Sequence, residues 1–249
     1  MKALHIALKM IDRPGEAFAE VAERPRSWWL PAGVIFASLV ALAWVAAPYQ
    51  VALANERLGE TLARLSATLS EEQMALVRAR STMTVPRYLL SAIGLGGGSL
   101  VIGWLLRAGI LHVSALALGY QGPWGKVFAA IVWSALPFFV RNALQAILIF
   151  AHRQIIAHEG LSFLVASGDW LADSRNLGYA FLAQVDPFVV WHLVLLTVGL
   201  AAVTGLTRRK TGLMALLVWL LFVALKLVPV AISASFTRGG RCPWDRRRR

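Results

Sequence analysis

The hydrophobic residues of the chain fall into five long runs, separated by stretches in which charged and polar residues are frequent. Each run has about 20 residues or more, the length that an α-helix needs to cross a hydrocarbon layer of about 30 Å. A soluble protein can bury one helix that is apolar all round, but it cannot bury several of this length. The pattern therefore predicts an all-α integral membrane protein, a bundle of about five transmembrane helices in the ranges 28–54, 86–119, 126–150, 186–206 and 211–232.

The first 27 residues predict a separate segment at the membrane interface. Pro14 opens a stretch in which Phe18, Val21 and Ala22 share one helical face and glutamates occupy another. This pattern is typical of a short helix that lies in the headgroup region. The predicted organisation is an N-terminal interfacial helix at 1–27, a five-span membrane domain at 28–232 and a basic C-terminal tail at 233–249.

Two polar stretches between the spans predict extramembrane helical loops. In the first, residues 55–85, Ser70 and Gln73 have the spacing of a capping box at the beginning of a helix. The second loop, residues 151–185, is mixed and contains a short amphipathic piece. The glycines and the proline at 119–123 predict a tight hairpin between the second and third spans.

The composition agrees with the membrane class and limits other functions. Hydrophobic residues make up 58% of the chain and charged residues only 15%, with a mean hydropathy of +0.62. The net charge is +12, but the basic residues lie at the ends of apolar runs and in the tail. We interpret them as topology signals and contacts with the lipid bilayer, and expect no nucleic-acid partner. The single cysteine, Cys242, excludes an intrachain disulfide.

Lysine and arginine give conflicting indications of orientation. The first span and the short basic loop at 208–210 favour a cytoplasmic N-terminus. The total count is higher on the opposite side, because the tail, which ends in Arg246 to Arg249, is strongly basic. We expect a cytoplasmic N-terminus; an even number of spans, which would bring the tail inside, is the alternative.

Four residues form a candidate polar intramembrane site. Arg141, Asn142 and Gln145 lie together in the third run, where an ionisable group costs about 2.5–3.5 kcal/mol at the helix centre. They predict a polar seam with another helix. Asp186 precedes Pro187 at the beginning of the fourth run, a pattern typical of a helix cap. The alternative is a partner for Arg141, or a site for a proton or a substrate.

Other polar residues of the apolar runs have simpler interpretations. We expect Arg107 to mark an interface in an overlong helix and Lys226 to snorkel to a membrane surface. His112 and His192 are expected to form hydrogen bonds to neighbouring helices.

Two pairs of small residues with a spacing of four predict close helix packing, within the bundle or in a homodimer. They are Gly94 with Gly98, and Ala201 with Gly205. The glycines do not form a phosphate-binding loop, because no predicted strand precedes them and no Gly-Lys-Ser/Thr follows.

The chain shows no motif for catalysis or for a bound cofactor. His152, His158, Glu159 and Asp169 in the second loop match no compact metal-ligand spacing. The sequence also lacks the paired intramembrane aspartates, His-Glu-x-x-His and Gly-x-Ser-Gly patterns of intramembrane proteases. We therefore expect no enzyme activity, no cofactor and no metal site.

Several short segments together resemble the bacterial branch of the Yip-domain (Ypt-interacting protein) family. They are Pro14 to Phe18, Glu23 to Pro31, the Gly119 to Gly122 hairpin, Asp186 to Trp191 with its Asp-x-Phe-x-x-Trp pattern, and Thr204 to Lys210. The resemblance covers nearly the whole chain. It implies a five-span helical bundle with a cytoplasmic N-terminus and no established catalytic residues; the family's eukaryotic members are linked to vesicle trafficking and Rab-type GTPases.

We therefore expect a non-enzymatic, polytopic membrane protein of the Yip type in the cytoplasmic (inner) membrane of a bacterium. Its expected role is that of an accessory or interaction subunit in membrane transport or organisation, with a protein partner or as a homo-oligomer. The alternative is a small transporter or channel that uses polar residues within the bundle. A lipid-handling enzyme, the third hypothesis, would need a clustered acid, base or metal.

Overall fold

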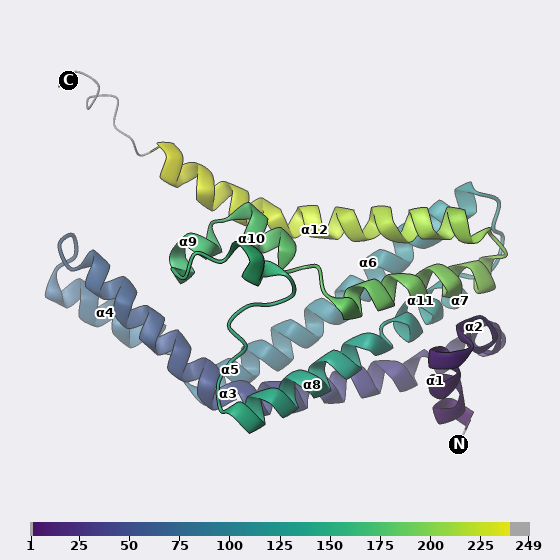
Figure 1. Ribbon diagram of the computed structural model, residues 1–249, viewed down its shortest axis with the longest axis horizontal. Helices are drawn as coiled ribbons and strands as arrows, with labels where there is room; N and C mark the ends of the chain where they lie inside the picture. The colour runs from purple at the N-terminus through teal and green to yellow at the C-terminus, as the bar shows by residue number, and fades with distance from the viewer. Residues whose placement is uncertain (1, 240–249) are drawn as a thin grey trace. The chain divides into compact units, whose positions relative to one another are not determined.

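The computed structural model of the chain describes residues 2–239, and every regular element within that range is a helix (Figure 1). The elements are α1 (Lys2–Asp12), α2 (Pro14–Glu23), η1 (Pro25–Trp28), α3 (Trp29–Leu65), α4 (Glu71–Ser81), α5 (Val85–Leu89), η2 (Leu90–Leu95), α6 (Gly96–Ala117), α7 (Trp124–Ser134), α8 (Leu136–His152), η3 (Ser162–Val165), α9 (Trp170–Ser174), α10 (Leu177–Leu182), α11 (Pro187–Thr204) and α12 (Arg208–Gly239).

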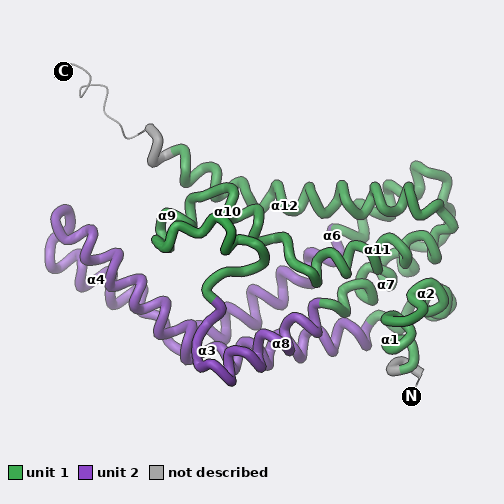
Figure 2. Tube along the Cα trace, viewed as in Figure 1, with its two compact units in different colours: residues 1–28, 107–137, 157–249 green, residues 29–106, 138–156 purple. Residues whose placement is uncertain are grey.

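These elements form two compact units (Figure 2). The first unit comprises the described residues of 1–28, 107–137 and 157–249, and the second comprises residues 29–106 and 138–156. The helix α6 contributes to both units, because the boundary falls between Leu106 and Arg107.

Within the described part of the chain, five helical stretches are long and apolar enough to cross a membrane. They are Pro25–Leu65, Val85–Ala117, Trp124–His152, Pro187–Thr204 and Arg208–Ser235. The predicted all-α membrane fold with five spans is thus confirmed, and the protein is a multi-pass membrane protein.

The first span continues farther than its apolar run. The apolar run ends near Ala54, whereas α3 extends to Leu65. Residues 55–65 contain no proline, and most of them are good helix formers, so the helix continues after it has become polar. The first extramembrane loop therefore contains the end of α3 as well as α4.

The third span is interrupted, which the apolar pattern did not predict. The helix α7 ends at Ser134 and α8 begins at Leu136. Pro137 has no N–H with which to continue the helical hydrogen bonds, and the Ala135 N–H bonds instead to the Val132 carbonyl at 3.2 Å. The second span contains a different irregularity, the π-helical turn η2.

Gly119 ends α6 and makes the predicted hairpin. Its φ of 98° lies in the left-handed region, which glycine adopts without a steric cost. The Gly119 N–H donates to the Leu116 carbonyl and the Tyr120 N–H to the Ala115 carbonyl, both at 3.0 Å. These two hydrogen bonds together form a Schellman motif, which turns the chain toward α7.

The predicted capping box at the beginning of α4 is confirmed. The Gln73 N–H donates to the Ser70 hydroxyl, and the Ser70 N–H donates to the Gln73 side-chain oxygen at 3.0 Å. Two N–H groups that the first helical turn leaves without an intrahelical partner are therefore satisfied.

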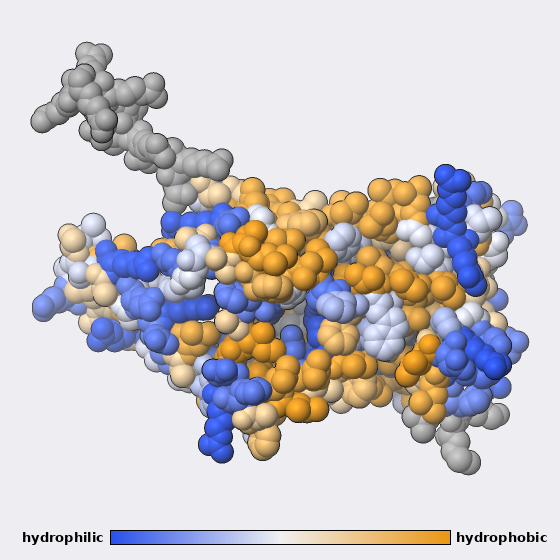
Figure 3. Space-filling model, viewed as in Figure 1, coloured by the Kyte–Doolittle hydropathy of each residue, from blue (hydrophilic) through white to orange (hydrophobic). Residues whose placement is uncertain are grey.

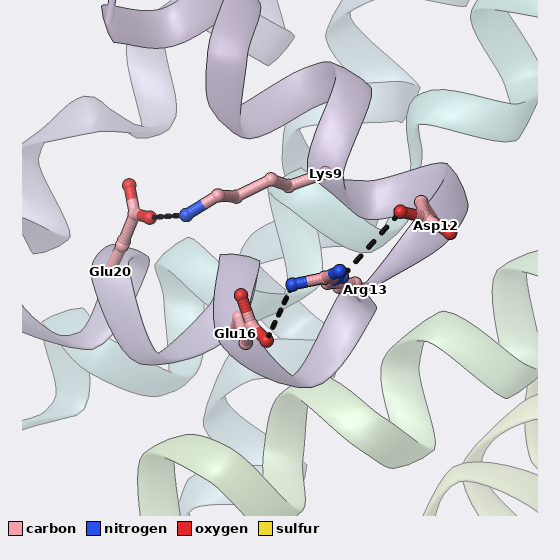
Figure 4. A network of polar contacts seen from close by, with 5 residues as sticks. All are labelled: Lys9, Asp12, Arg13, Glu16 and Glu20. Carbon is pink, nitrogen blue, oxygen red and sulfur yellow. Dashed lines mark hydrogen bonds and ion pairs between the residues drawn. The ribbon is translucent and has the colours of Figure 1, made fainter.

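The N-terminal segment is a pair of helices, of which α2 corresponds to the predicted interfacial helix. Phe18 and Val21 on α2 are fully buried, and α2 packs against α7 and α11 within the first unit. The Lys9 ammonium of α1 donates to the Glu20 carboxylate of α2, and Arg13 pairs with Asp12 and Glu16 (Figure 4). The apolar face predicted for the membrane interface is thus part of the protein core.

The second loop, residues 151–185, contains the short helices η3, α9 and α10. The Leu161 N–H donates to the carbonyls of Leu182 and Val185 at 3.0 and 3.1 Å, which fastens the loop to the end of α10. Asp173, which is buried, accepts hydrogen bonds from the Ser167 N–H and hydroxyl, both at 2.8 Å. These bonds lower the pKa of the Asp173 carboxyl.

The surfaces of α12 and α4 differ as the sequence leads one to expect (Figure 3). Hydrophobic residues, including Leu213, Leu217 and Leu225, are exposed along α12, as is appropriate for a helix in contact with lipid. Hydrophilic residues gather around α4, outside the spans. Of the predicted basic tail, Arg246 to Arg249 lie outside the described residues.

Candidate functional site within the membrane spans

Asn142 makes the polar seam that the third span predicts. Its side chain is buried, and its Nδ2 donates to the Ser38 hydroxyl at 3.1 Å. Ser38 in turn donates to the Ile35 carbonyl of its own helix at 2.7 Å. The seam joins α8 to α3 within the second unit, and it satisfies two polar side chains that would be costly among apolar groups.

Arg141 lies next to this seam on α8. Its guanidinium carbon is 5.1 Å from the centroid of the Phe138 ring, a distance typical of a cation–π contact. Gln145, one helical turn farther along, is half-buried. The structure thus places Arg141, Asn142 and Gln145 on one helix of the second unit; their use as a functional site stays a prediction.

Asp186 caps α11 in the first unit. Its Oδ1 accepts a hydrogen bond from the Val189 N–H at 2.7 Å, and Pro187 occupies the first helical position. The capping interpretation is therefore confirmed. A pairing of Asp186 with Arg141 stays a prediction.

His192 forms the predicted hydrogen bond to a neighbouring helix. It lies on α11, is buried, and its Nδ1 is 2.8 Å from the Ser134 carbonyl oxygen. A carbonyl oxygen only accepts, so Nδ1 carries the proton. Ser134 is the last residue of α7 before the interruption near Pro137, and His192 compensates there for the irregular helical bonding.

His112 is different. Its ring lies edge-on to Tyr120, with 6.0 Å between the ring centroids. Its Nδ1 is buried and has no hydrogen-bond partner among the described residues, so the predicted interhelical bond is not present at this atom.

Arg107 and Lys226 belong to a second polar cluster, which lies in the first unit. The Arg107 guanidinium of α6 stacks on the Phe222 ring of α12, at 4.5 Å from the guanidinium carbon to the ring centroid. Lys226, one turn beyond Phe222, donates from Nζ to the Gln184 side-chain oxygen at 2.8 Å. Arg107 is thus held between helices, whereas the sequence predicts only that it marks an interface.

The comparison that decides the family is a match to the model of the Yip1 domain over residues 8–228. The chain belongs to the Yip1 domain family. The match takes in all five spans up to Val228 and begins within α1. No curated protein and no solved structure matches the chain at a significant level.

In this Yip1 domain, two close approaches at glycine occur beside the predicted pairs. A Cβ added at Gly97 would lie 2.7 Å from the Phe36 ring, and one at Gly199 would lie 2.7 Å from the Phe18 ring. The predicted positions are more open, since no atom lies within 4 Å of a Cβ at Gly98 or Gly205. Gly205, with a φ of 72°, ends α11, and its N–H donates to the Ala201 carbonyl at 3.0 Å.

The packing roles of Gly94, Gly98, Ala201 and Gly205 therefore stay predictions. Gly94 has only Leu90 of its own helical stretch at 4.0 Å from an added Cβ.

Among residues 2–239, no three His, Cys, Asp or Glu side chains are grouped so that they could hold a metal ion. In the second loop, His158 contacts Tyr179, with Nδ1 3.1 Å from the hydroxyl oxygen. This contact gives His158 a structural role in the first unit of the Yip1 domain.

Proposed function

We propose that the protein is a non-enzymatic accessory or interaction subunit in membrane transport or organisation, and that it acts through contacts between transmembrane helices. The observation that carries the proposal is the uncovered small-residue surface of α6. Gly98 is exposed and has no atom within 4 Å of an added Cβ, and Val101 and Ile102 beside it are exposed. Small residues at such a place let the backbone of another helix approach closely.

The test is affinity purification from native membranes in a mild detergent, followed by mass spectrometry of the proteins that co-purify. The wild-type protein is expected to retain a stoichiometric partner or a second copy of itself. Gly98→Leu should release it, because the larger side chain keeps the partner helix away. Gly96→Leu is the matched control, since Gly96 is half-buried on another face of the same helix and also has no atom within 4 Å of an added Cβ.

A monomer without any partner, or equal loss of the partner in both variants, would contradict the proposal. If both variants retain the partner, the partner binds to a surface other than the one around Gly98.

We also propose that the N-terminus lies in the cytoplasm of a bacterium and that the protein lies in its inner membrane. The basic residues before the first span and at 208–210 support this orientation. In a protein whose Cys242 is replaced by serine, Ser70→Cys should react with a membrane-impermeant thiol reagent added to intact cells. Gln121→Cys, in the hairpin on the other side of the second span, should react only after lysis. If Gln121→Cys reacts in intact cells and Ser70→Cys only after lysis, the N-terminus lies outside the cytoplasm.

The second candidate function is a small transporter or channel, favoured by the buried hydrogen bond between Asn142 and Ser38 beside Arg141. Reconstituted into liposomes, such a protein would conduct protons or other ions under a membrane potential. Arg141→Leu should then abolish the flux while the protein stays folded. Flux that survives this substitution would remove Arg141 from the mechanism.

A further inference from the structure

The Phe222 ring holds the Arg107 side chain at a defined place in the spans of the first unit. Stacking on the Phe222 ring covers the flat face of the guanidinium, whose carbon lies 4.5 Å from the ring centroid. The N–H donors of a guanidinium project from its edge, in a fork that matches the oxygens of a phosphate or a carboxylate. The pair thus presents oriented donors beside an apolar surface.

Lys226 adds a second cation, on the face of α12 that carries Phe222. Residues four apart lie one above the other on a helix, so Lys226 follows Phe222 by one turn. Lys226 is exposed, and its Nζ donates to the Gln184 side-chain oxygen at 2.8 Å. Gln184 follows α10, which packs beside α12 (Figure 1).

The helix α11 defines the level of this cluster in the membrane. It has 18 residues and is therefore about 27 Å long, close to the hydrocarbon thickness of about 30 Å. Its cap, Asp186, marks one boundary, and Gln184 lies just before it. Lys226, bonded to Gln184, accordingly lies at that boundary, and Phe222 lies about 6 Å deeper along α12. A long arginine side chain reaches from the apolar region to this level.

We propose that Arg107, Phe222 and Lys226 form a binding site for the phosphate headgroup of an anionic phospholipid. The phosphodiester is the anion that a membrane presents at this level. Arg107 contributes a fork of donors, and Lys226 contributes a compact positive charge. The exposed leucines Leu221 and Leu225, next to Phe222 and Lys226 on α12, provide apolar surface for the acyl chains. The site does not depend on the proposed role as an interaction subunit.

The test is a titration of the delipidated full-length protein in detergent with phosphatidylglycerol or phosphatidylcholine, with bound lipids counted by native mass spectrometry. We expect phosphatidylglycerol to bind about tenfold more tightly. Arg107→Gln and Lys226→Gln should each weaken its binding about fivefold, the effect of one basic group at an anionic surface, and leave phosphatidylcholine unchanged. Arg107→Lys should retain part of the preference, because it keeps the charge but loses the fork.

Arg209→Gln is the matched control, because Arg209 is an exposed basic residue at the beginning of α12. The proposal fails if the two lipids bind equally tightly. It also fails if Arg209→Gln weakens the binding of phosphatidylglycerol as much as Arg107→Gln and Lys226→Gln do. Displacement of the lipid by millimolar inorganic phosphate would show that the site takes a free anion, and would overturn the assignment to a lipid. If Arg107→Gln does not fold, Lys226→Gln still tests the proposal, because Lys226 is exposed and its replacement should not disturb folding.

Discussion

The Phe18 ring of α2 lies directly against Gly199 of α11. A Cβ on Gly199 would be 2.7 to 2.9 Å from three atoms of that ring. Both residues are buried, and Phe18 belongs to the core that joins the N-terminal helices to α7 and α11. The absence of a side chain at Gly199 is therefore what allows the N-terminal helices to dock on α11.

Gly199→Ala should consequently lower the stability of the protein. The added methyl group must displace a buried aromatic ring, and such overpacking costs about 1–3 kcal/mol. Equilibrium unfolding in mixed micelles measures the change. Gly109→Ala is the control, because Gly109 is helical and has no atom within 4 Å of an added Cβ. Equal stability of Gly199→Ala and the wild type would contradict the packing described here.

Gly160→Ala should open the second loop. Gly160 has a φ of 54°, and an added Cβ would lie 2.6 Å from the Val185 carbonyl oxygen and 2.8 Å from that of Leu182. These carbonyls accept the Leu161 N–H, so the methyl group would displace the backbone that fastens the loop. Hydrogen exchange at the Leu161 amide should become much faster.

Gly168→Ala separates backbone strain from collision in this loop. Gly168 also has a positive φ, 83°, but no atom lies within 4 Å of an added Cβ. This variant should be less stable than the wild type by only the cost of a left-handed alanine, about 1–2 kcal/mol. Its Leu161 amide should stay protected from exchange. Similar exchange in the two variants would show that the contacts at Gly160 are unimportant.

Features that depend on neighbouring residues in the chain could be predicted from the sequence. The five spans follow from apolar run length, the α4 cap from Ser70 and Gln73, and the α11 cap from Asp186 before Pro187. In each case the hydrogen bonds or the apolar residues lie within one helical stretch.

Features that depend on distant residues could not be predicted in the same way. The pairing of Gly199 with Phe18, or of Arg107 with Phe222, joins helices whose contact the residue spacing does not define. One missed feature did have a local signal, since Pro137 within the third apolar run indicates an interrupted helix. Through this interruption the Ser134 carbonyl becomes the partner of His192.

Asn142 and Ser38 should be energetically coupled. Their hydrogen bond joins α8 to α3 at 3.1 Å, and such bonds within membranes average about 0.6 kcal/mol, with a maximum of about 1.7 kcal/mol. A double-mutant cycle of Asn142→Ala and Ser38→Ala should give a coupling of that size in micelle unfolding. A cycle with Thr61→Ala should give none, because Thr61 bonds to Arg57 far along α3 from Ser38. Additive effects of the first pair would contradict the bond.

The contact between Lys9 and Glu20 should make the N-terminal helices sensitive to acid. The hydrogen bond from Lys9 lowers the pKa of the Glu20 carboxyl below its ordinary value of 4.5. A carboxyl whose pKa is lowered by folding contributes stability above its unfolded pKa, and this contribution is lost as the pH falls through the folded pKa. Glu20→Gln should therefore unfold more easily than the wild type at pH 7, and the difference should shrink as the pH falls below 4.5 and through the lowered pKa of Glu20.

The measurement is thermal unfolding of the purified protein in detergent from pH 7 to pH 3. Lys9→Gln should behave like Glu20→Gln, because both remove the same contact (Figure 4). Glu23→Gln is the matched control, since Glu23 is exposed at the end of the same helix. A difference between Glu20→Gln and the wild type that stays constant at all pH values would arise from the loss of side-chain packing, and would exclude the ion pair as its cause.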